Sequence, residues 1–283
     1  VDFGIGVRLI YGTKVLYGYT NSNERNELKR IVKELSTLDL KNILAEGATL
    51  NFLKTQNLHP ARLSLDKNVD LESKIRYLMN LDQASRSQHE KIAQVVAMSL
   101  EKRQEVEIFN SEGLHAQDER NYTRIISQAI AADGGEQAVG FEGPGALRGW
   151  EFSEQIDPQN LGEKVARQAM TKLYADNAPA GKMPVIIDNG FGGVIFHEAC
   201  GHLLETTAVA KKASVFWDKS DQMIANECVS AVDDGTLRNL WGSINIDDEG
   251  MPTQKTQLIK NGRLANFMVD KVGHMKTGHP RSG

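Results

Sequence analysis

The alternation of hydrophobic and polar positions predicts that the chain starts with a hairpin and a helix. Two short β-prone runs, 7–10 and 15–19, flank Gly12-Thr13, a pair typical of a hairpin turn. After Ser22-Asn23, a candidate helix cap, hydrophobic residues recur three, four and seven positions apart, as on one face of an amphipathic helix. These residues are Leu28, Ile31, Val32 and Leu35.

The middle of the chain predicts a second helix followed by strands. Ile75, Leu78 and Met79 continue a helical pattern after Asp70. From about residue 92 to residue 133 the pattern changes to consecutive strands at 95–100, 106–109 and 122–131, with a turn at 111–113. We interpret this segment as an antiparallel meander.

Residues 134–150 contain six glycines and Pro144, which predicts a loop. The segment has no G-x-G-x-x-G pattern between a strand and a helix, so a phosphate-binding role is not favoured. A further helix is expected behind the cap Asp157 and Pro158, with a buried face. That face would contain Leu161, Val165, Ala169 and Leu173.

The segment 177–181, Asn-Ala-Pro-Ala-Gly, has the composition of a linker, and we place a domain boundary there. The predicted domains are 1–178 and 179–283. The second opens with an apolar strand at 183–188, a glycine-rich turn and a helical stretch through Glu205. Later, Asn261-Gly262 stands between apolar runs, which is a strong hairpin signal.

The expected fold class is therefore α+β: an amino-terminal antiparallel sheet with helices, followed by a β-rich carboxy-terminal domain that carries the helix at 197–205. The chain begins within a strand pattern and ends soon after another, so we expect a fragment in which both domains are incomplete.

Charge and cysteine content limit the possible partners and location. A net charge of -4 without a basic stripe argues against nucleic-acid and anionic-membrane partners, which require a concentrated positive field. The two cysteines, Cys200 and Cys228, are too few to stabilise a chain of 283 residues by disulfides. With no apparent leader and no apolar run near the ~20 residues of a membrane helix, we expect a cytoplasmic protein.

The segment His197-Glu198-Ala199-Cys200-Gly201-His202 combines residues that suit metal chemistry. Two imidazoles are good ligands for Zn²⁺, and a neighbouring carboxylate can take a proton from an activated water. The histidines are five positions apart, which corresponds to about 140° on a regular helix. We therefore expect a π-type bulge, and we expect Gly201 to tolerate the distortion.

Several alternatives stay open at this motif. His197 could instead be a core histidine, with Glu198 solvated and His202 a charge at a helix end. A catalytic zinc site also needs a third protein ligand. Cys200 is expected to pack as a small apolar residue, and Glu205 could be a ligand or could orient an imidazole. The candidate third ligands are Glu205, Glu227, Cys228, Asp233, Asp234 and His274.

The run at 184–202, PVIIDNGFGGVIFHEACGH, resembles the TldD family of the TldD/PmbA metallopeptidases. Further similar segments are 142–145, 231–236, 241–243, 246–250 and 252–253. The resemblance extends over nearly the whole chain. One departure is Leu203, where family members commonly have glycine.

The resemblance implies a zinc peptidase with His197 and His202 as zinc ligands and Glu198 as the catalytic base. It also implies a dimer, either with itself or with a related subunit that lacks the motif. The third ligand would be a cysteine nearer the carboxy terminus, in sequence absent from this chain. We therefore expect zinc-dependent hydrolysis of peptides or unfolded protein segments; the alternatives are a noncatalytic binding or assembly subunit, and a zinc amidase acting on small molecules.

Overall fold

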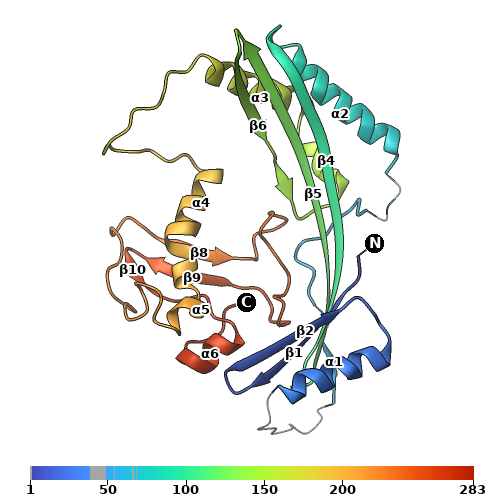
Figure 1. Ribbon diagram of the computed structural model, residues 1–283, viewed down its shortest axis with the longest axis vertical. Helices are drawn as coiled ribbons and strands as arrows, with labels where there is room; N and C mark the ends of the chain where they lie inside the picture. The colour runs from blue at the N-terminus through green and yellow to red at the C-terminus, as the bar shows by residue number, and fades with distance from the viewer. Residues whose placement is uncertain (1, 39–48, 54, 66, 68) are drawn as a thin grey trace.

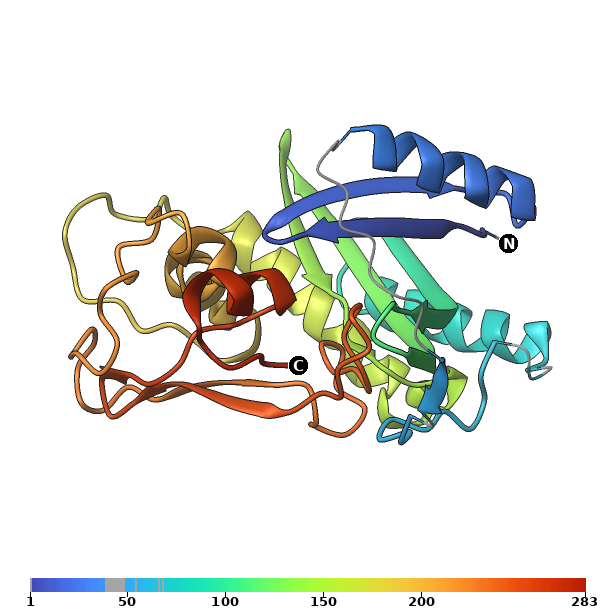
Figure 2. The same ribbon diagram turned by 90° about the horizontal axis from the view of Figure 1, so that it is seen from below.

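The computed structural model describes residues 2–38, 49–53, 55–65, 67 and 69–283. It contains both helices and strands, arranged in several sheets (Figure 1). Seen from below, a hairpin with helix α1 lies on one side of the long central strands, and α2 and α3 lie on the other (Figure 2). The described part of the chain has no helix that is long and apolar enough to cross a membrane.

The amino-terminal hairpin forms as predicted, from β1 (Ile5–Tyr11) and β2 (Lys14–Thr20) in antiparallel register. Helix α1 (Arg25–Thr37) packs on it through the buried residues Ile31 and Leu35, whereas Val32 is exposed. The cap lies one residue later than expected, at Glu24. Ser22 contributes differently, because its hydroxyl accepts a hydrogen bond from the Glu24 amide.

The predicted meander is one long antiparallel hairpin, β4 (Ile92–Phe109) and β5 (Leu114–Asp133), joined by the predicted turn. The expected division of β4 into shorter strands is wrong. Charged residues between 101 and 107 interrupt the hydrophobic pattern, but the backbone stays paired with β5 throughout. Alternation of exposed and partly buried residues is enough here, since the hydrogen-bond ladder needs no apolar side chain.

The expectation of a loop at 134–150 is also wrong. Strand β6 (Glu136–Glu142) and the short β7 (Gly145–Ala146) both pair with β5, on the side opposite β4. Gly140 is required by packing, because a Cβ there would lie 1.8 Å from the Val165 carbonyl of the covering helix. The short β3 (Asn51–Leu53) runs parallel to β5.

Two helices cover the upper part of this sheet and follow the predicted cap signals. Helix α2 (Leu71–Arg86) begins after Asp70, whose side chain accepts from two amides, and α3 (Pro158–Leu173) begins after Asp157. A 3-10 helix, Trp150–Gln155, precedes α3. The core between helices and sheet contains Leu81, Ile92, Val95, Ile125, Ala129, Leu161, Val165 and Ala169.

The second half is built around a small antiparallel sheet in the order β10-β9-β8. Its strands are β8 (Ala231–Asp234), β9 (Lys255–Lys260) and β10 (Arg263–Leu264), and helix α6 (Lys271–Thr277) follows. The predicted hairpin at Asn261-Gly262 is confirmed, with both residues at positive φ, 48° and 78°.

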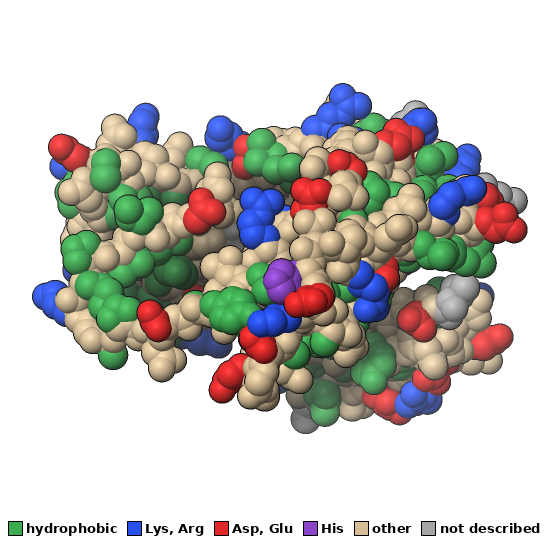
Figure 3. Space-filling view, turned by 90° about the horizontal axis from the view of Figure 1, so that it is seen from above, with side chains coloured by type: hydrophobic (Ala, Val, Ile, Leu, Met, Phe, Trp, Pro, Cys, Tyr) green, Lys and Arg blue, Asp and Glu red, His purple; other side chains and the backbone are tan. Residues whose placement is uncertain are grey.

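The strand expected at 183–188 is not formed. The segment is part of an extended connection between α3 and the next helical turn (Figure 1), and no described strand pairs with it. Its apolar side chains are exposed, Ile186 at 99% and Val185 at 72%, because an apolar run becomes a strand only beside a partner. Seen from above, exposed hydrophobic side chains are visible at the left of the surface as well as in its middle and at its right (Figure 3). The domain boundary at residue 178 stays a prediction.

Buried polar contacts join the two halves. Asp118 and Arg120 of β5 form an ion pair at 2.9 Å, and Asn245 donates to Asp118 at 2.8 Å. His59, which is only 3% exposed, accepts a hydrogen bond from the Asn239 amide and faces two carbonyl oxygens with its other ring nitrogen. These contacts hold the loop at 235–248 against the long hairpin, through Asp118, and against the segment that contains His59.

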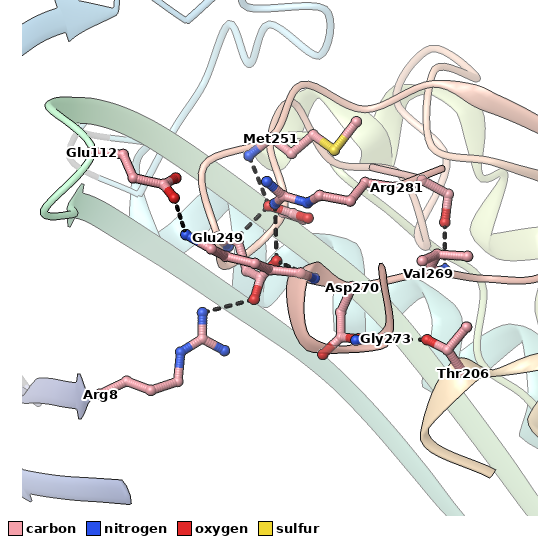
Figure 4. A network of polar contacts seen from close by, with 12 residues as sticks. Arg8, Glu112, Thr206, Glu249, Met251, Val269, Asp270, Gly273 and Arg281 are labelled. Carbon is pink, nitrogen blue, oxygen red and sulfur yellow. Dashed lines mark hydrogen bonds and ion pairs between the residues drawn. The ribbon is translucent and has the colours of Figure 1, made fainter. Parts of the chain in front are cut away.

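A second set of contacts surrounds Glu249 (Figure 4). Its carboxylate accepts from Arg8 of β1 at 2.7 Å and from Arg281 at 2.9 Å, and it also accepts from the Lys271 amide at 2.9 Å. The Lys271 side chain reaches Glu112, in the turn of the long hairpin, at 2.6 Å. One carboxylate thus connects the first hairpin with the last helix of the chain.

Candidate metal centre

The segment 190–209 consists of short helical turns of different types. A 3-10 turn, Gly190–Gly192, leads into α4 (Gly193–Phe196). A π-helical turn, His197–Gly201, follows, then a 3-10 turn, His202–Leu204, and α5 (Thr206–Val209). The His202 amide donates to the His197 carbonyl five residues earlier, which confirms the predicted π-type geometry.

The π turn forms without an unusual backbone conformation at Gly201. Its backbone lies in the ordinary right-handed helical region, at φ -53° and ψ -58°, where other residues fit equally well. A Cβ on Gly201 would lie 3.7 Å from Nδ1 of His197, an ordinary contact distance. The π turn therefore does not depend on glycine's conformational freedom.

The π turn brings the two histidine rings together. Their centroids are 4.3 Å apart, and Nε2 of His202 lies 3.9 Å from a carboxylate oxygen of Glu198. Each of the three residues can offer one ligand atom such that all of these atoms lie within 4.8 Å of one another. All three side chains are exposed, so His197 is not a core histidine.

Of the other candidate ligands, only Glu205 contacts the motif. Its carboxylate oxygen Oε1 lies 2.8 Å from Nδ1 of His202, whereas the contact of this ring with Glu198 is made by Nε2. Cys200 packs partly buried against the core of the second half, as expected, and burial raises the pKa of its thiol.

The remaining candidates lie apart from the histidines. Glu227 and Cys228 are exposed in a separate loop, and Nδ1 of His274 contacts the His279 carbonyl. On β8, burial and the neighbouring Asp234 raise the pKa of Asp233. Within the described residues, the group that could hold a metal contains His197, Glu198 and His202 and no further histidine, cysteine or acid.

The donor set fits a borderline-soft divalent cation. Two imidazole nitrogens are ligands that Zn²⁺ favours, and a carboxylate beside them can either bind the ion or act as a base. Because the group is exposed, an additional ligand and a substrate can reach the same point. A catalytic zinc site normally has three protein ligands, so two imidazoles would supply only part of such a site.

Two domains of one protein family match the chain in sequence. The PmbA/TldA metallopeptidase C-terminal domain matches residues 180–283, and the PmbA/TldA metallopeptidase central domain matches residues 65–173. A metalloprotease TldD homolog from Haemophilus influenzae is 31% identical over 291 residues, covering 100% of this chain and 60% of the relative. A zinc metalloprotease TldD homolog from Saccharolobus solfataricus is 22% identical, covering 100% of this chain and 62% of the relative.

The fold is also similar to a solved structure. A Thermotoga maritima protein described as a candidate modulator of a DNA gyrase superimposes with a TM-score of 0.80 at 21% identity. That superposition covers 100% of this chain and 63% of the Thermotoga protein. The chain thus spans about 60% of the length of the relatives that it matches.

Proposed function

Because the chain belongs to the PmbA/TldD metallopeptidase family, we propose that it forms part of a zinc-dependent peptidase. The observation that carries this proposal is the convergence of His197, Glu198 and His202 through the π turn. His197 and His202 would bind the ion, and Glu198 would act as the general base. The name of the Saccharolobus relative supports zinc as the metal.

The two histidines and Glu198 have separate roles in the proposed reaction. Bound zinc supplies Lewis-acid activation of a water and of the scissile carbonyl. Glu198 takes the proton from the attacking water and returns it to the leaving amine. The imidazoles would hold the ion beside this carboxylate, since Nε2 of His202 is 3.9 Å from Glu198. The third protein ligand lies outside the group, and the family resemblance favours a cysteine beyond residue 283.

The proposed substrates are peptides or unfolded protein segments. An extended chain can add to a sheet edge by backbone hydrogen bonds, which requires little sequence preference. Strand β8 offers such an edge, because in the described residues it pairs only with β9. The helical segment with the histidines packs on this sheet through Cys200 and Leu204. A peptide with N-methylated backbone amides should therefore be cleaved more slowly than its unmodified counterpart.

The family resemblance also supports a dimer, with itself or with a related subunit that lacks the motif. Light scattering of the full-length protein, alone and with such a subunit, measures this directly. A cytoplasmic location, inferred from the low cysteine content, belongs to the same proposal.

The mechanism is tested with the variant Glu198→Gln in the full-length protein. General-base catalysis typically contributes about 10²–10⁴-fold, so hydrolysis of an unfolded peptide should fall by at least about 10²-fold. The variant should retain zinc, measured by mass spectrometry. Glu227→Gln, which alters an exposed glutamate outside the group, should leave the rate unchanged. Equal activity of Glu198→Gln and wild type would refute the mechanism, and cleavage of small amides only would favour an amidase.

A further inference from the structure

Glu205 occupies a position for which its residue type is poorly suited. It is the N-cap of α5, with φ -76° and ψ 134°, where serine, threonine, aspartate and asparagine are preferred because their short side chains accept from the first free amides. The Glu205 side chain makes no such cap hydrogen bond. A glutamate at an N-cap that makes no cap hydrogen bond indicates that its carboxylate has another role.

Both oxygens of the Glu205 carboxylate have partners. Oε1 lies 2.8 Å from Nδ1 of His202, and Oε2 accepts a hydrogen bond from the Thr207 hydroxyl at 3.2 Å. With one oxygen held by Thr207, the other is directed at the histidine ring. The contact is therefore held from both ends of the carboxylate.

The backbone around Glu205 is held by neighbouring buried residues. The Thr206 amide donates to the Met268 carbonyl at 2.9 Å, and the Met268 amide donates to the Leu204 carbonyl at 2.9 Å. Leu204 and Thr206 are 0% and 2% exposed. Thr206 also contacts Asp270, the cap of α6, within the contacts around Glu249 (Figure 4). The backbone that carries the Glu205 side chain is thus held in place by its neighbours.

We propose that Glu205 is a positioning residue that selects the tautomer and orientation of His202, so that Nε2 of His202 binds the metal. An ionised carboxylate only accepts hydrogen bonds, so it places the ring hydrogen on Nδ1 and leaves the Nε2 lone pair free. Nε2 is the ring nitrogen that faces Glu198. This inference rests on the proposed metal site and adds a residue that acts through one of its ligands.

The two histidines differ in whether a carboxylate contacts the imidazole ring. In the described part of the chain, no hydrogen bond to the His197 ring is seen, whereas the His202 ring has its carboxylate partner. Loss of Glu205 should consequently remove the fixed orientation of the His202 ring and leave the His197 ring unaffected. Zinc binding should weaken without being abolished.

The test measures the affinity of the full-length protein for Zn²⁺ by competition with a chromophoric chelator. Glu205→Ala should raise the dissociation constant by about 10–100-fold, the usual effect of removing a carboxylate behind a ligating histidine. Glu205→Gln should restore most of the affinity, because its amide oxygen still accepts from Nδ1-H. Glu24→Ala is the control, since Glu24 is exposed and, like Glu205, is an N-cap glutamate without a cap hydrogen bond; the zinc affinity of this variant should equal that of wild type.

A second variant keeps the test decisive if Glu205→Ala does not fold. Thr207→Val removes the hydroxyl that holds Oε2 while keeping the size of the side chain, and it should weaken zinc binding several-fold. The visible spectrum of the Co²⁺-substituted protein should change in both variants, as expected for an altered ligand and not for a general loss of stability. Zinc affinities within twofold of wild type would overturn the role of Glu205 alone. A wild type that binds no zinc would overturn the metal site itself, and this inference with it.

Discussion

Glu151 provides the sharpest test of how buried polar groups hold the fold that supports the site. It lies in the 3-10 helix Trp150–Gln155 and is 7% exposed. Its two carboxylate oxygens accept hydrogen bonds from the amides of Arg62 and Leu63, at 2.8 Å and 2.7 Å. Glu151→Gln leaves one acceptor oxygen for two amides and turns an NH₂ group toward the other.

The expected cost follows from this geometry. Hydrogen bonds to a charged group contribute about 1.5–3 kcal/mol, and a buried amide left without a partner costs about 1–3 kcal/mol. Glu151→Gln should therefore lower the free energy of unfolding by about 1–3 kcal/mol. Glu154→Gln is the control from the same helix, because its ion pair with Arg62 is exposed and contributes about 0–1 kcal/mol.

The loss of stability in Glu151→Gln should also depend on pH. Burial acts to raise the pKa of Glu151, but backbone hydrogen bonds, first those from the amides of Arg62 and Leu63 and then those from Glu151 and Gly149, together outweigh it and hold the pKa below the usual 4.5. A carboxyl with a lowered folded-state pKa stabilises the protein above its unfolded-state pKa, and this stability is lost as the pH falls through the folded-state value. The difference between wild type and Glu151→Gln should be full at pH 7 and should shrink below about pH 4.5.

Urea unfolding of the full-length protein over this pH range measures the difference, and hydrogen exchange of the Arg62 and Leu63 amides reports on it locally. Faster exchange of both amides is expected in Glu151→Gln and not in Glu154→Gln. The reasoning would be refuted if both variants lowered the free energy of unfolding by the same small amount. It would also be refuted if the difference in this free energy between wild type and Glu151→Gln did not change with pH.

Two further changes probe the layer of helices. Gly140→Ala should lower the free energy of unfolding by about 1–3 kcal/mol or more, because the added Cβ would lie 1.8 Å from the Val165 carbonyl. Gly242→Ala is the control, because a Cβ there would meet no atom within 4 Å, and it should change this free energy little. Thermal denaturation compares the two variants. Asp157→Ala removes the cap hydrogen bond to the Gln159 amide and should cost about 1 kcal/mol, measured in the same way; a change near zero would mean that this cap does not stabilise α3.

Local signals in the sequence predicted local structure well. Asp157-Pro158 marks the start of α3, and Asn261-Gly262 forms the turn between β9 and β10, because each pair has a backbone preference that needs no distant partner. The five-residue spacing of His197 and His202 likewise predicted the π turn, since on a regular helix the rings would diverge. Chemistry and spacing together were sufficient to identify the three converging residues.

Features that depend on distant partners were missed. The six glycines and Pro144 in residues 134–150 predict a loop where β6 forms, whereas Gly140 allows the backbone of α3 to approach the sheet. The apolar run at 183–188 predicts a strand, but no described strand pairs with it. The role of Glu205 was open in the sequence. The available signal was a glutamate three residues after His202, a candidate metal ligand.

Anomalous diffraction at the zinc absorption edge, from crystals of the full-length protein grown with Zn²⁺, tests the central claim most directly. The account predicts one strong peak within about 2.0–2.1 Å of a ring nitrogen of His197 and of Nε2 of His202, with the Glu198 carboxylate beside it. A peak bound elsewhere, or no peak at these imidazoles in protein that cleaves peptides, would contradict it.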